Sequence, residues 1–200
     1  MMRKLSHQEL VDRQTHIQDS QKLPFTIILN NIRSLYNVGS IFRTADGLGV
    51  EKIWLCGITG TPGTERSRIE KTALGAEKKV PWEHRKDSLS VIRELKAKGY
   101  EIVLLEQIEE STPYQEYQPE KPVCLIMGNE ISGVSDELLA LADCAIEIEM
   151  SGLKNSLNVT VAFGIVAYHL KNCFKKPSCQ LSSPQSLSGD PNSGFPLSRE

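Results

Sequence analysis

Three segments of the chain each combine an apolar run, a loop of Gly, Asn and Ser, and a helical pattern. They are NNIRSLYNVGSIFRTADGLGV (residues 30–50), LIMGNEISGVSDELL (residues 125–139) and IEIEMSGLKNSLNVTVAFGIVAYHL (residues 146–170). Open α/β sheets bind ligands at loops that lead from a strand to a helix. The polar side chains of these loops are therefore candidates for one shared site. They offer a guanidinium, a carboxylate, two carboxamides and a hydroxyl, from Arg43, Glu130, Asn37, Asn158 and Ser156.

Each of these side chains also has an ordinary structural interpretation. Arg43 lies two positions after Ile41, about 200° around the helix, so it points away from the apolar stripe, as a solvated arginine would. Glu130 suits an exposed loop, and Ser156 and Asn158 suit the cap of the last helix. The residue types alone leave these alternatives open.

The elements that must position these residues follow from hydrophobic patterning. Apolar runs predict strands at residues 25–30, 52–58, 101–107, 122–128 and 144–150. Helical patterns with cap signals, including Asn37 at the start of the first helix, fall at residues 37–48, 67–76, 88–98, 135–142 and 157–171. Strands that alternate with helices indicate an α/β fold, with a parallel sheet flanked by helices on both faces.

The chain divides into three regions. Residues 1–24 form an N-terminal extension, with a weakly amphipathic helical pattern in Arg3–Gln18, and residues 25–172 form the α/β domain. Residues 173–200 are expected to be a disordered tail. From Pro177 onward the sequence is rich in Ser, Pro and Gly without an apolar period, so ordering it would bury too little surface.

Composition limits the function classes. The formal net charge of −2 is not typical of a nucleic-acid-binding protein, which is usually basic. The odd set of five cysteines has no C-x-x-C pair, as expected for reduced thiols in the cytoplasm. No signal core or membrane-spanning stretch is evident, and the four histidines show no metal-ligand spacing, so we assign no metal and no membrane partner.

In order and spacing, the three motifs between Phe25 and Leu170 resemble those of the SpoU (TrmH-like) RNA ribose 2′-O-methyltransferases, of the SPOUT class. The resemblance implies a parallel α/β sheet with a C-terminal deep trefoil knot. It also implies S-adenosyl-L-methionine as cofactor, a tRNA or rRNA partner and a homodimer. Periodicity could not have suggested a knot, because knots are nearly absent from other folds.

The resemblance also assigns roles to individual residues. Asn37 would orient Arg43, and Arg43 would act on the ribose 2′-hydroxyl and its phosphate, with Glu130 paired to the guanidinium. Because a guanidinium stays protonated in proteins, we assign Arg43 electrostatic work rather than proton removal. Ser156 and Asn158 would complete the active site. The methyl donor would be held around Gly128, Ile148 and Leu157.

The sequence thus predicts a methyltransferase acting on a ribose 2′-hydroxyl of structured RNA. No further RNA-binding domain precedes Phe25, which slightly favours tRNA over rRNA. One alternative is an RNA-binding or assembly protein with the same fold and no activity, which the intact set of motif residues disfavours. A second is an unrelated nucleotide-binding α/β protein. The only G-x-G, at Gly47–Gly49, ends a helix rather than beginning one, and this argues against a dinucleotide fold.

Overall fold

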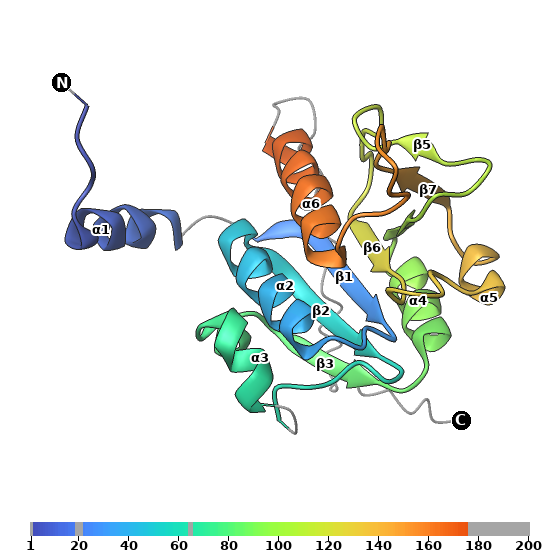
Figure 1. The fold of residues 1–200 in the computed structure, drawn as a ribbon, viewed down its shortest axis with the longest axis horizontal. Helices are drawn as coiled ribbons and strands as arrows, with labels where there is room; N and C mark the ends of the chain where they lie inside the picture. The colour runs from blue at the N-terminus through green and yellow to red at the C-terminus, as the bar shows by residue number, and fades with distance from the viewer. Residues whose placement is uncertain (1, 19–21, 64–65, 176–200) are drawn as a thin grey trace, which may run out of the picture.

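The computed structural model describes residues 2–18, 22–63 and 66–175, and their main feature is one parallel sheet (Figure 1). Its seven strands run in the order β3-β2-β1-β6-β4-β7-β5, and every neighbouring pair is parallel. The strands are β1 (Leu23–Asn30), β2 (Val50–Cys56), β3 (Trp82–Arg85), β4 (Glu101–Leu105), β5 (Thr112–Pro113), β6 (Val123–Met127) and β7 (Cys144–Glu147). The predicted fold class, a parallel sheet flanked by helices, is confirmed.

Helices cover both faces of the sheet. α2, α3 and α6 lie on one face and α4 and α5 on the other, whereas residues 7–13 of α1, whose side chains the structure describes, contribute to neither core cluster (Figure 1). The helices are α1 (His7–Gln18), α2 (Leu35–Leu48), α3 (Arg66–Ala73), α4 (Ser88–Ala97), α5 (Asp136–Leu139) and α6 (Val159–Lys175), with a 3₁₀ turn η1 (Ala76–Lys78). None of the helices in the described ranges is long and apolar enough to cross a membrane.

The two faces of the sheet follow the period of two along each strand. In β1, Phe25, Ile27 and Leu29 pack into the core under α2, α3 and α6. Ile28 points the other way, into the core under α4 and α5. All four side chains are fully buried. A central strand covered on both faces reads as a continuous apolar run, which is why the sequence shows β1 so clearly.

The sheet register brings the three motif loops to one edge. Leu29 of β1 pairs with Met127 of β6, so the loops that follow these strands emerge side by side. On the other flank of β6, β4 pairs with β7, which precedes the third motif. Parallel strands end at the same edge, so segments about a hundred residues apart in the chain become neighbours.

Helix ends agree with the sequence in some places and correct it in others. Gly49 and Gly99 end α2 and α4 with φ of 76° and 84°, as expected for residues that tolerate the left-handed region. Asp87 caps α4 through the N–H groups of Leu89 and Ser90. The start of α2 was predicted wrongly, because Ser34 is the N-cap and Asn37 lies inside the first turn.

The last helix also differs from the prediction. α6 begins at Val159 rather than Leu157, and it continues to Lys175 with Cys173 buried. Residues 173–175, which the sequence assigned to the tail, therefore belong to the helix. The rest of the predicted tail lies outside the described residues. The short strands β3 and β5 were not predicted, because four and two residues give too little pattern to recognise.

Gly39 allows α2 to pack closely on α3. A Cβ at this position would overlap the Ile69 carbonyl oxygen and the Thr72 hydroxyl, and Thr72 itself donates to the Tyr36 carbonyl at 2.9 Å. The close approach at Gly39 is therefore a contact between two helices of the chain. It fixes the helix that carries Asn37.

Gly39→Ala should lower the free energy of unfolding by about 1 to 3 kcal/mol, because the backbone of α3 must move to accept one methyl group. Gly47→Ala is the matched control. Its Cβ would lie 3.7 Å from the Tyr168 hydroxyl, an ordinary contact, and alanine favours the helix by up to about 1 kcal/mol. Urea unfolding followed by circular dichroism measures both. Equal stability of the two variants would contradict this account of Gly39.

Candidate active site

The Glu130 carboxylate joins the loop after β6 to the start of α2. One oxygen accepts the backbone N–H of Arg33 at 3.0 Å. The other accepts the N–H of Ser34 at 3.2 Å and the side-chain amide of Asn37 at 3.1 Å. The first turn of α2 has no acidic residue of its own. Glu130 thus supplies, from about a hundred residues away, the negative charge that a helix N-terminus favours.

The third motif joins the same network through Asn158. Its Nδ2 donates to Oδ1 of Asn37 at 3.3 Å, while its own Oδ1 accepts the Thr160 N–H at 2.9 Å. Asn158 therefore caps α6 and contacts the first motif at the same time. The structural interpretation of Asn158 as a helix cap is confirmed. Glu130, Asn37 and Asn158 form one hydrogen-bonded chain across all three motifs.

Asn129, which the sequence did not single out, shapes the loop that presents Glu130. Its Nδ2 donates to the Asn31 carbonyl at 2.7 Å, and its Oδ1 accepts the N–H of Ile131 at 2.9 Å. Its backbone also exchanges two hydrogen bonds of 2.9 Å with Gly133. A side-chain oxygen that accepts an N–H two residues later forms an Asx turn, which is a recognisable role for asparagine before a loop.

Gly128 is required by this loop. A Cβ there would lie 2.6 Å from the carbonyl carbon of Gly133 and 2.8 Å from the nitrogen of Val134. Gly133 itself has φ of 64° and lies against the Glu106 carboxylate. The close approach at Gly128 is therefore between two parts of the loop's own backbone, and the expected contact with the methyl donor stays a prediction.

Glu130 is held in its ionised form. Burial opposes ionisation, but the backbone N–H groups of Arg33, Glu130 and Ser34, together with the Asn37 amide, outweigh it and lower the pKa below the ordinary 4.5. Near neutral pH the carboxylate is a fixed acceptor. It directs the Asn37 amide group toward itself and leaves Asn37 Oδ1 for Asn158.

Arg43 lies elsewhere on α2. It is exposed and off the buried stripe, as predicted. It is six residues beyond Asn37, which corresponds to about 9 Å along the helix axis. Within the described chain Arg43 forms no ion pair with Glu130 and no hydrogen bond with Asn37, so the expected pairing is not found. Glu130 and Asn37 hold each other and the N-terminus of α2 instead.

The segment between β7 and α6 is open. Residues 151–158 are all exposed, and no backbone N–H from 151 to 157 donates to an acceptor in the described part of the chain. Ser156 lies here, and it is not part of the hydrogen-bonded chain. Ile148 is half-buried and Leu157 is 37% exposed. Gln107 Nε2 donates to the Asn155 carbonyl at 3.0 Å and ties this segment to the end of β4.

The residues expected to hold the methyl donor fit such a molecule. Ile148 and Leu157 offer apolar surface, and the 151–157 backbone offers N–H groups without protein partners. A ligand with a flat heteroaromatic ring and a charged polar end needs both kinds of contact. Where the described residues are concerned, no cluster of three or more His, Cys, Asp or Glu side chains is placed to hold a metal ion.

The parallel sheet, with its motif loops joined at the carboxyl edge, defines the class of open α/β proteins whose ligands bind outside the strand ends. Within this class, residues 24–168 match the model of the SpoU rRNA Methylase family. The match covers well over half of the chain. The chain belongs to this family.

Curated relatives act on two kinds of RNA. The tRNA (guanosine(18)-2′-O)-methyltransferase of Aquifex aeolicus is 29% identical over 185 residues, which is 89% of this chain and 86% of that protein. The 23S rRNA (guanosine(2553)-2′-O)-methyltransferase RlmP of Bacillus subtilis is 32% identical over 145 residues, 72% of this chain and 57% of that protein. The two sequence identities are too similar to distinguish a tRNA substrate from an rRNA substrate.

Solved structures agree with the fold. The crystal structure of the A. aeolicus TrmH/SpoU tRNA modifying enzyme aligns with a TM-score of 0.73 at 28% identity, covering 88% of this chain and 89% of that chain. An AdoMet-bound rRNA methyltransferase from Sinorhizobium meliloti aligns with a TM-score of 0.70 at 29% identity, covering 76% and 57%. Both alignments extend over at least three quarters of this chain.

Glu130→Gln should lower the free energy of unfolding by about 1 to 2 kcal/mol at pH 7, because a neutral amide is a weaker acceptor for three N–H donors. The folded-state pKa of Glu130 is lowered, so its contribution is fully present above the ordinary value of 4.5 and is lost as the pH falls through the folded value. The gap between wild type and variant should therefore be constant from about pH 6 to 8 and shrink below about pH 5.

Urea unfolding at a series of pH values tests this expectation. Glu109→Gln is the control, because Glu109 is exposed and has no hydrogen bond or ion pair with the described residues. A gap that persists unchanged at pH 4, or a control that behaves like Glu130→Gln, would show that the charge of Glu130 does not hold α2.

Proposed function

We propose that the protein transfers a methyl group from S-adenosyl-L-methionine to a ribose 2′-hydroxyl of structured RNA. One observation carries the proposal: in a member of the SpoU family, all three motifs meet through the Glu130–Asn37–Asn158 hydrogen-bonded chain. The donor supplies an electrophilic methyl group. The chain's own residues must then bind the donor, orient the ribose and stabilise the charge that develops on its oxygen.

Donor binding falls to the segments around β6, β7 and α6. Gly128 keeps the loop after β6 close-packed, and Ile148 and Leu157 provide apolar contacts. The exposed N–H groups of residues 151–157 are available for the polar parts of the donor. Ser156 lies within this run, so its hydroxyl is available to donor or ribose.

Asn37 and Arg43 have different roles toward the ribose. Asn37 is fixed by Glu130 on one side and Asn158 on the other, so it presents a fixed carboxamide at the start of α2. Arg43 is exposed, which leaves its planar fork available to a phosphate and to the oxygen that becomes negative.

We infer that the RNA is a tRNA or an rRNA, with tRNA slightly favoured, and that the work takes place in the cytoplasm. The A. aeolicus relative, which this chain covers nearly in full, is named for tRNA. Cys56, Cys124 and Cys144 are free thiols, in keeping with a reducing compartment. A binding or assembly protein without activity remains the alternative result of the methyl-transfer assay.

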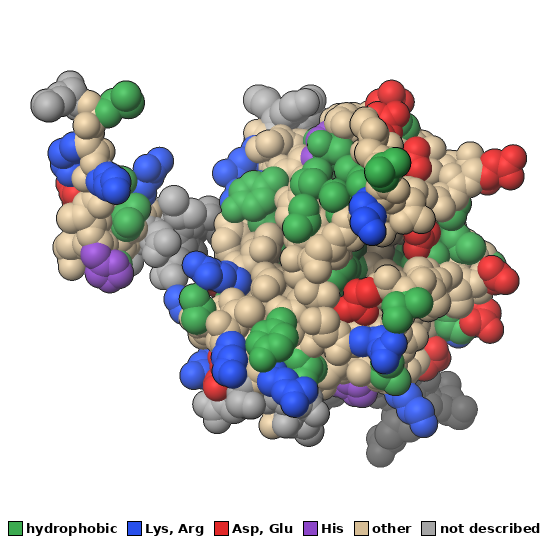
Figure 2. All heavy atoms as spheres, viewed as in Figure 1, with side chains coloured by type: hydrophobic (Ala, Val, Ile, Leu, Met, Phe, Trp, Pro, Cys, Tyr) green, Lys and Arg blue, Asp and Glu red, His purple; other side chains and the backbone are tan. Residues whose placement is uncertain are grey.

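We also propose a homodimer, and a trefoil knot in the C-terminal part of the domain, as the family resemblance implies. Val161 and Tyr168 are exposed and seven residues apart, so they share one side of α6, and Leu157, just before the helix, is exposed as well. Figure 2 shows hydrophobic side chains gathered over α6 on this face of the molecule. A second copy covering this stripe would bury apolar surface that a single chain leaves in water.

The assay for the proposed function uses donor labelled in the methyl group and total RNA from a strain that lacks this gene. The label should enter RNA, and nuclease mapping should find it on the 2′-oxygen of a single nucleotide. Calorimetry should show one donor per chain. Donor binding without transfer to any RNA would favour the binding-protein alternative.

Arg43→Ala should reduce single-turnover methylation by about 10²- to 10³-fold at saturating RNA and donor, because one preorganised charge-stabilising group is lost. Melting temperature and donor affinity should stay near wild type, since the side chain is exposed. Arg43→Lys should restore little, because a point charge cannot replace the planar fork. Arg93→Ala, at an exposed position on α4, is the control. If Arg43→Ala keeps most of the wild-type rate, Arg43 is only a surface residue.

Val161→Glu should convert the dimer into monomers, because a charge would be buried in the apolar contact. Light scattering measures the mass, and circular dichroism checks the fold. Ala97→Glu, at an exposed position on the opposite face of the sheet, should leave the dimer intact. A wild-type monomer that is active at assay concentration would rule out the dimer.

A further inference from the structure

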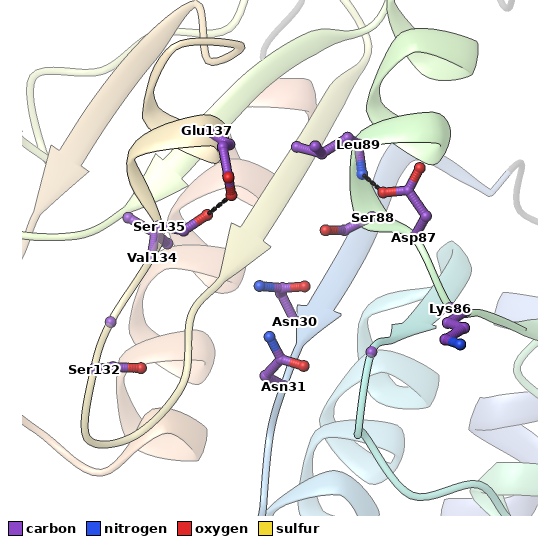
Figure 3. Close-up of a pocket in the computed structure, with 12 residues that line it drawn as sticks. Asn30, Asn31, Lys86, Asp87, Ser88, Leu89, Ser132, Val134, Ser135 and Glu137 are labelled. Atoms are coloured by element: carbon purple, nitrogen blue, oxygen red, sulfur yellow. Dashed lines mark hydrogen bonds between the residues drawn. The ribbon is translucent and has the colours of Figure 1, made fainter.

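A polar pocket lies beside the loop that carries Glu130, at the same edge of the sheet (Figure 3). It has a volume of about 370 Å³. It lies between the end of β1, the N-terminus of α4 and the residues that follow Glu130 in the loop after β6. Glu130 contacts the start of α2, whereas Ser132, Gly133 and Val134 line the pocket. None of the functional residues discussed so far lines it.

Asn30 provides the central polar group of the pocket. This last residue of β1 is only 7% exposed, yet its side chain has no hydrogen-bond partner in the described chain. Figure 3 shows its carboxamide projecting into the middle of the pocket, below Glu137 and beside Ser88. Its polar atoms are not among those closed off from solvent, so they remain open to the space of the pocket. A carboxamide held in this way has one acceptor and two donor positions to offer a ligand.

The charges around Asn30 favour a ligand that donates hydrogen bonds. Asp87 and Glu137 line the pocket with only Lys86 to balance them. The Asp87 oxygens each accept one N–H of α4, at 2.9 and 3.2 Å, and Glu137 accepts the Ser135 hydroxyl at 3.3 Å. Each carboxylate oxygen has further lone pairs. Because Asp87 already caps α4, the helix N-terminus is not available to a phosphate.

We propose that this pocket binds a nucleobase that carries an exocyclic amino group, from a nucleotide close to the methylated one. The inference rests on the proposed function and adds a base-selecting subsite to it. An asparagine carboxamide pairs with two adjacent positions on a base edge, and carboxylates accept from amino groups. The volume lies at the lower end of the range for small-ligand sites, which suits a single base. Proteins that read RNA sequence commonly take up such unstacked bases.

The pocket would select which nucleotide is methylated, because its distance from the active site is fixed. Asn31 links the pocket to the loop that carries Glu130. Its carbonyl accepts a hydrogen bond from Asn129 Nδ2, and its Oδ1 accepts one from the Ile58 N–H at 3.1 Å. The loop that holds Glu130 thus also forms a wall of the pocket. A base seated against Asn30 would set which ribose reaches Asn37.

The direct test uses the full-length protein and four free nucleosides. Guanosine, adenosine, cytidine and uridine are added in turn while the backbone amide signals of the lining residues Ser132, Gly133 and Val134 are followed by NMR. One or more of the three amino-bearing nucleosides should shift these signals, and uridine should not. Asn30→Leu, which keeps the side-chain size and removes the hydrogen bonds, should abolish binding. Asn172→Leu, at an exposed position on α6, should not.

The second test uses methyl transfer. Asn30→Leu should raise KM for RNA about 10-fold or more while donor affinity stays unchanged. Ser135→Trp, which fills the pocket from an exposed position, should do the same even if Asn30→Leu fails to fold. Wild-type KM in both variants, or uridine bound as well as the other nucleosides, overturns the pocket while leaving the proposed function intact. Nucleoside binding at Asn30 in a protein that transfers no methyl group supports the pocket and refutes the proposed function.

Discussion

The relative placement of Asn37 and Asn158 depends on one carboxylate at the start of one helix. Glu130 reaches from the loop after β6 to the N–H groups of Arg33 and Ser34 and to the amide of Asn37. These groups could otherwise be satisfied by water, but water would not fix α2 relative to β6. Because the acceptor is charged and the donors lie at a helix N-terminus, the interaction is stronger than an ordinary loop contact. Asn37, and through it Asn158, takes its orientation from this contact.

The surrounding structure makes that contact possible by close packing. Gly39 lets α2 lie against the backbone of α3, and Gly128 lets the loop after β6 fold back on Gly133. The parallel register of β1 and β6 brings the two loops to the same edge. A larger residue at either glycine would have to displace backbone, not merely a flexible side chain. The two close contacts therefore set how accurately Glu130 meets α2.

The loop after β6 has two sides with different environments. On one side, Glu130 serves the start of α2; on the other, Ser132 to Val134 line the pocket that contains Asn30. Asn129 links both sides, since its amide holds Asn31 while its oxygen shapes the turn. A change in loop conformation would alter both sites together. This shared wall is a physical reason for substrate recognition and methyl transfer to be coupled.

The sequence by itself determined the local features. The apolar runs of β1 and β6 predict strands buried on both faces, Asp87 predicts the cap of α4, and Gly49 and Gly99 predict helix ends. These features depend on a few neighbouring residues, so they can be read from the chain directly. The three motifs also identified Asn37, Glu130 and Asn158 as candidate site residues, and the structure joins all three by hydrogen bonds.

The tertiary structure alone decided which groups meet. It assigned Glu130 to the N-terminus of α2 rather than to Arg43, and it gave Asn158 both a cap and a contact with Asn37. It also revealed the parts played by Asn129 and Asn30. These outcomes depend on the order of strands in the sheet and on loops about a hundred residues apart. The type of a polar side chain determines how many hydrogen bonds it can make. Only the folded sheet determines which groups become its partners.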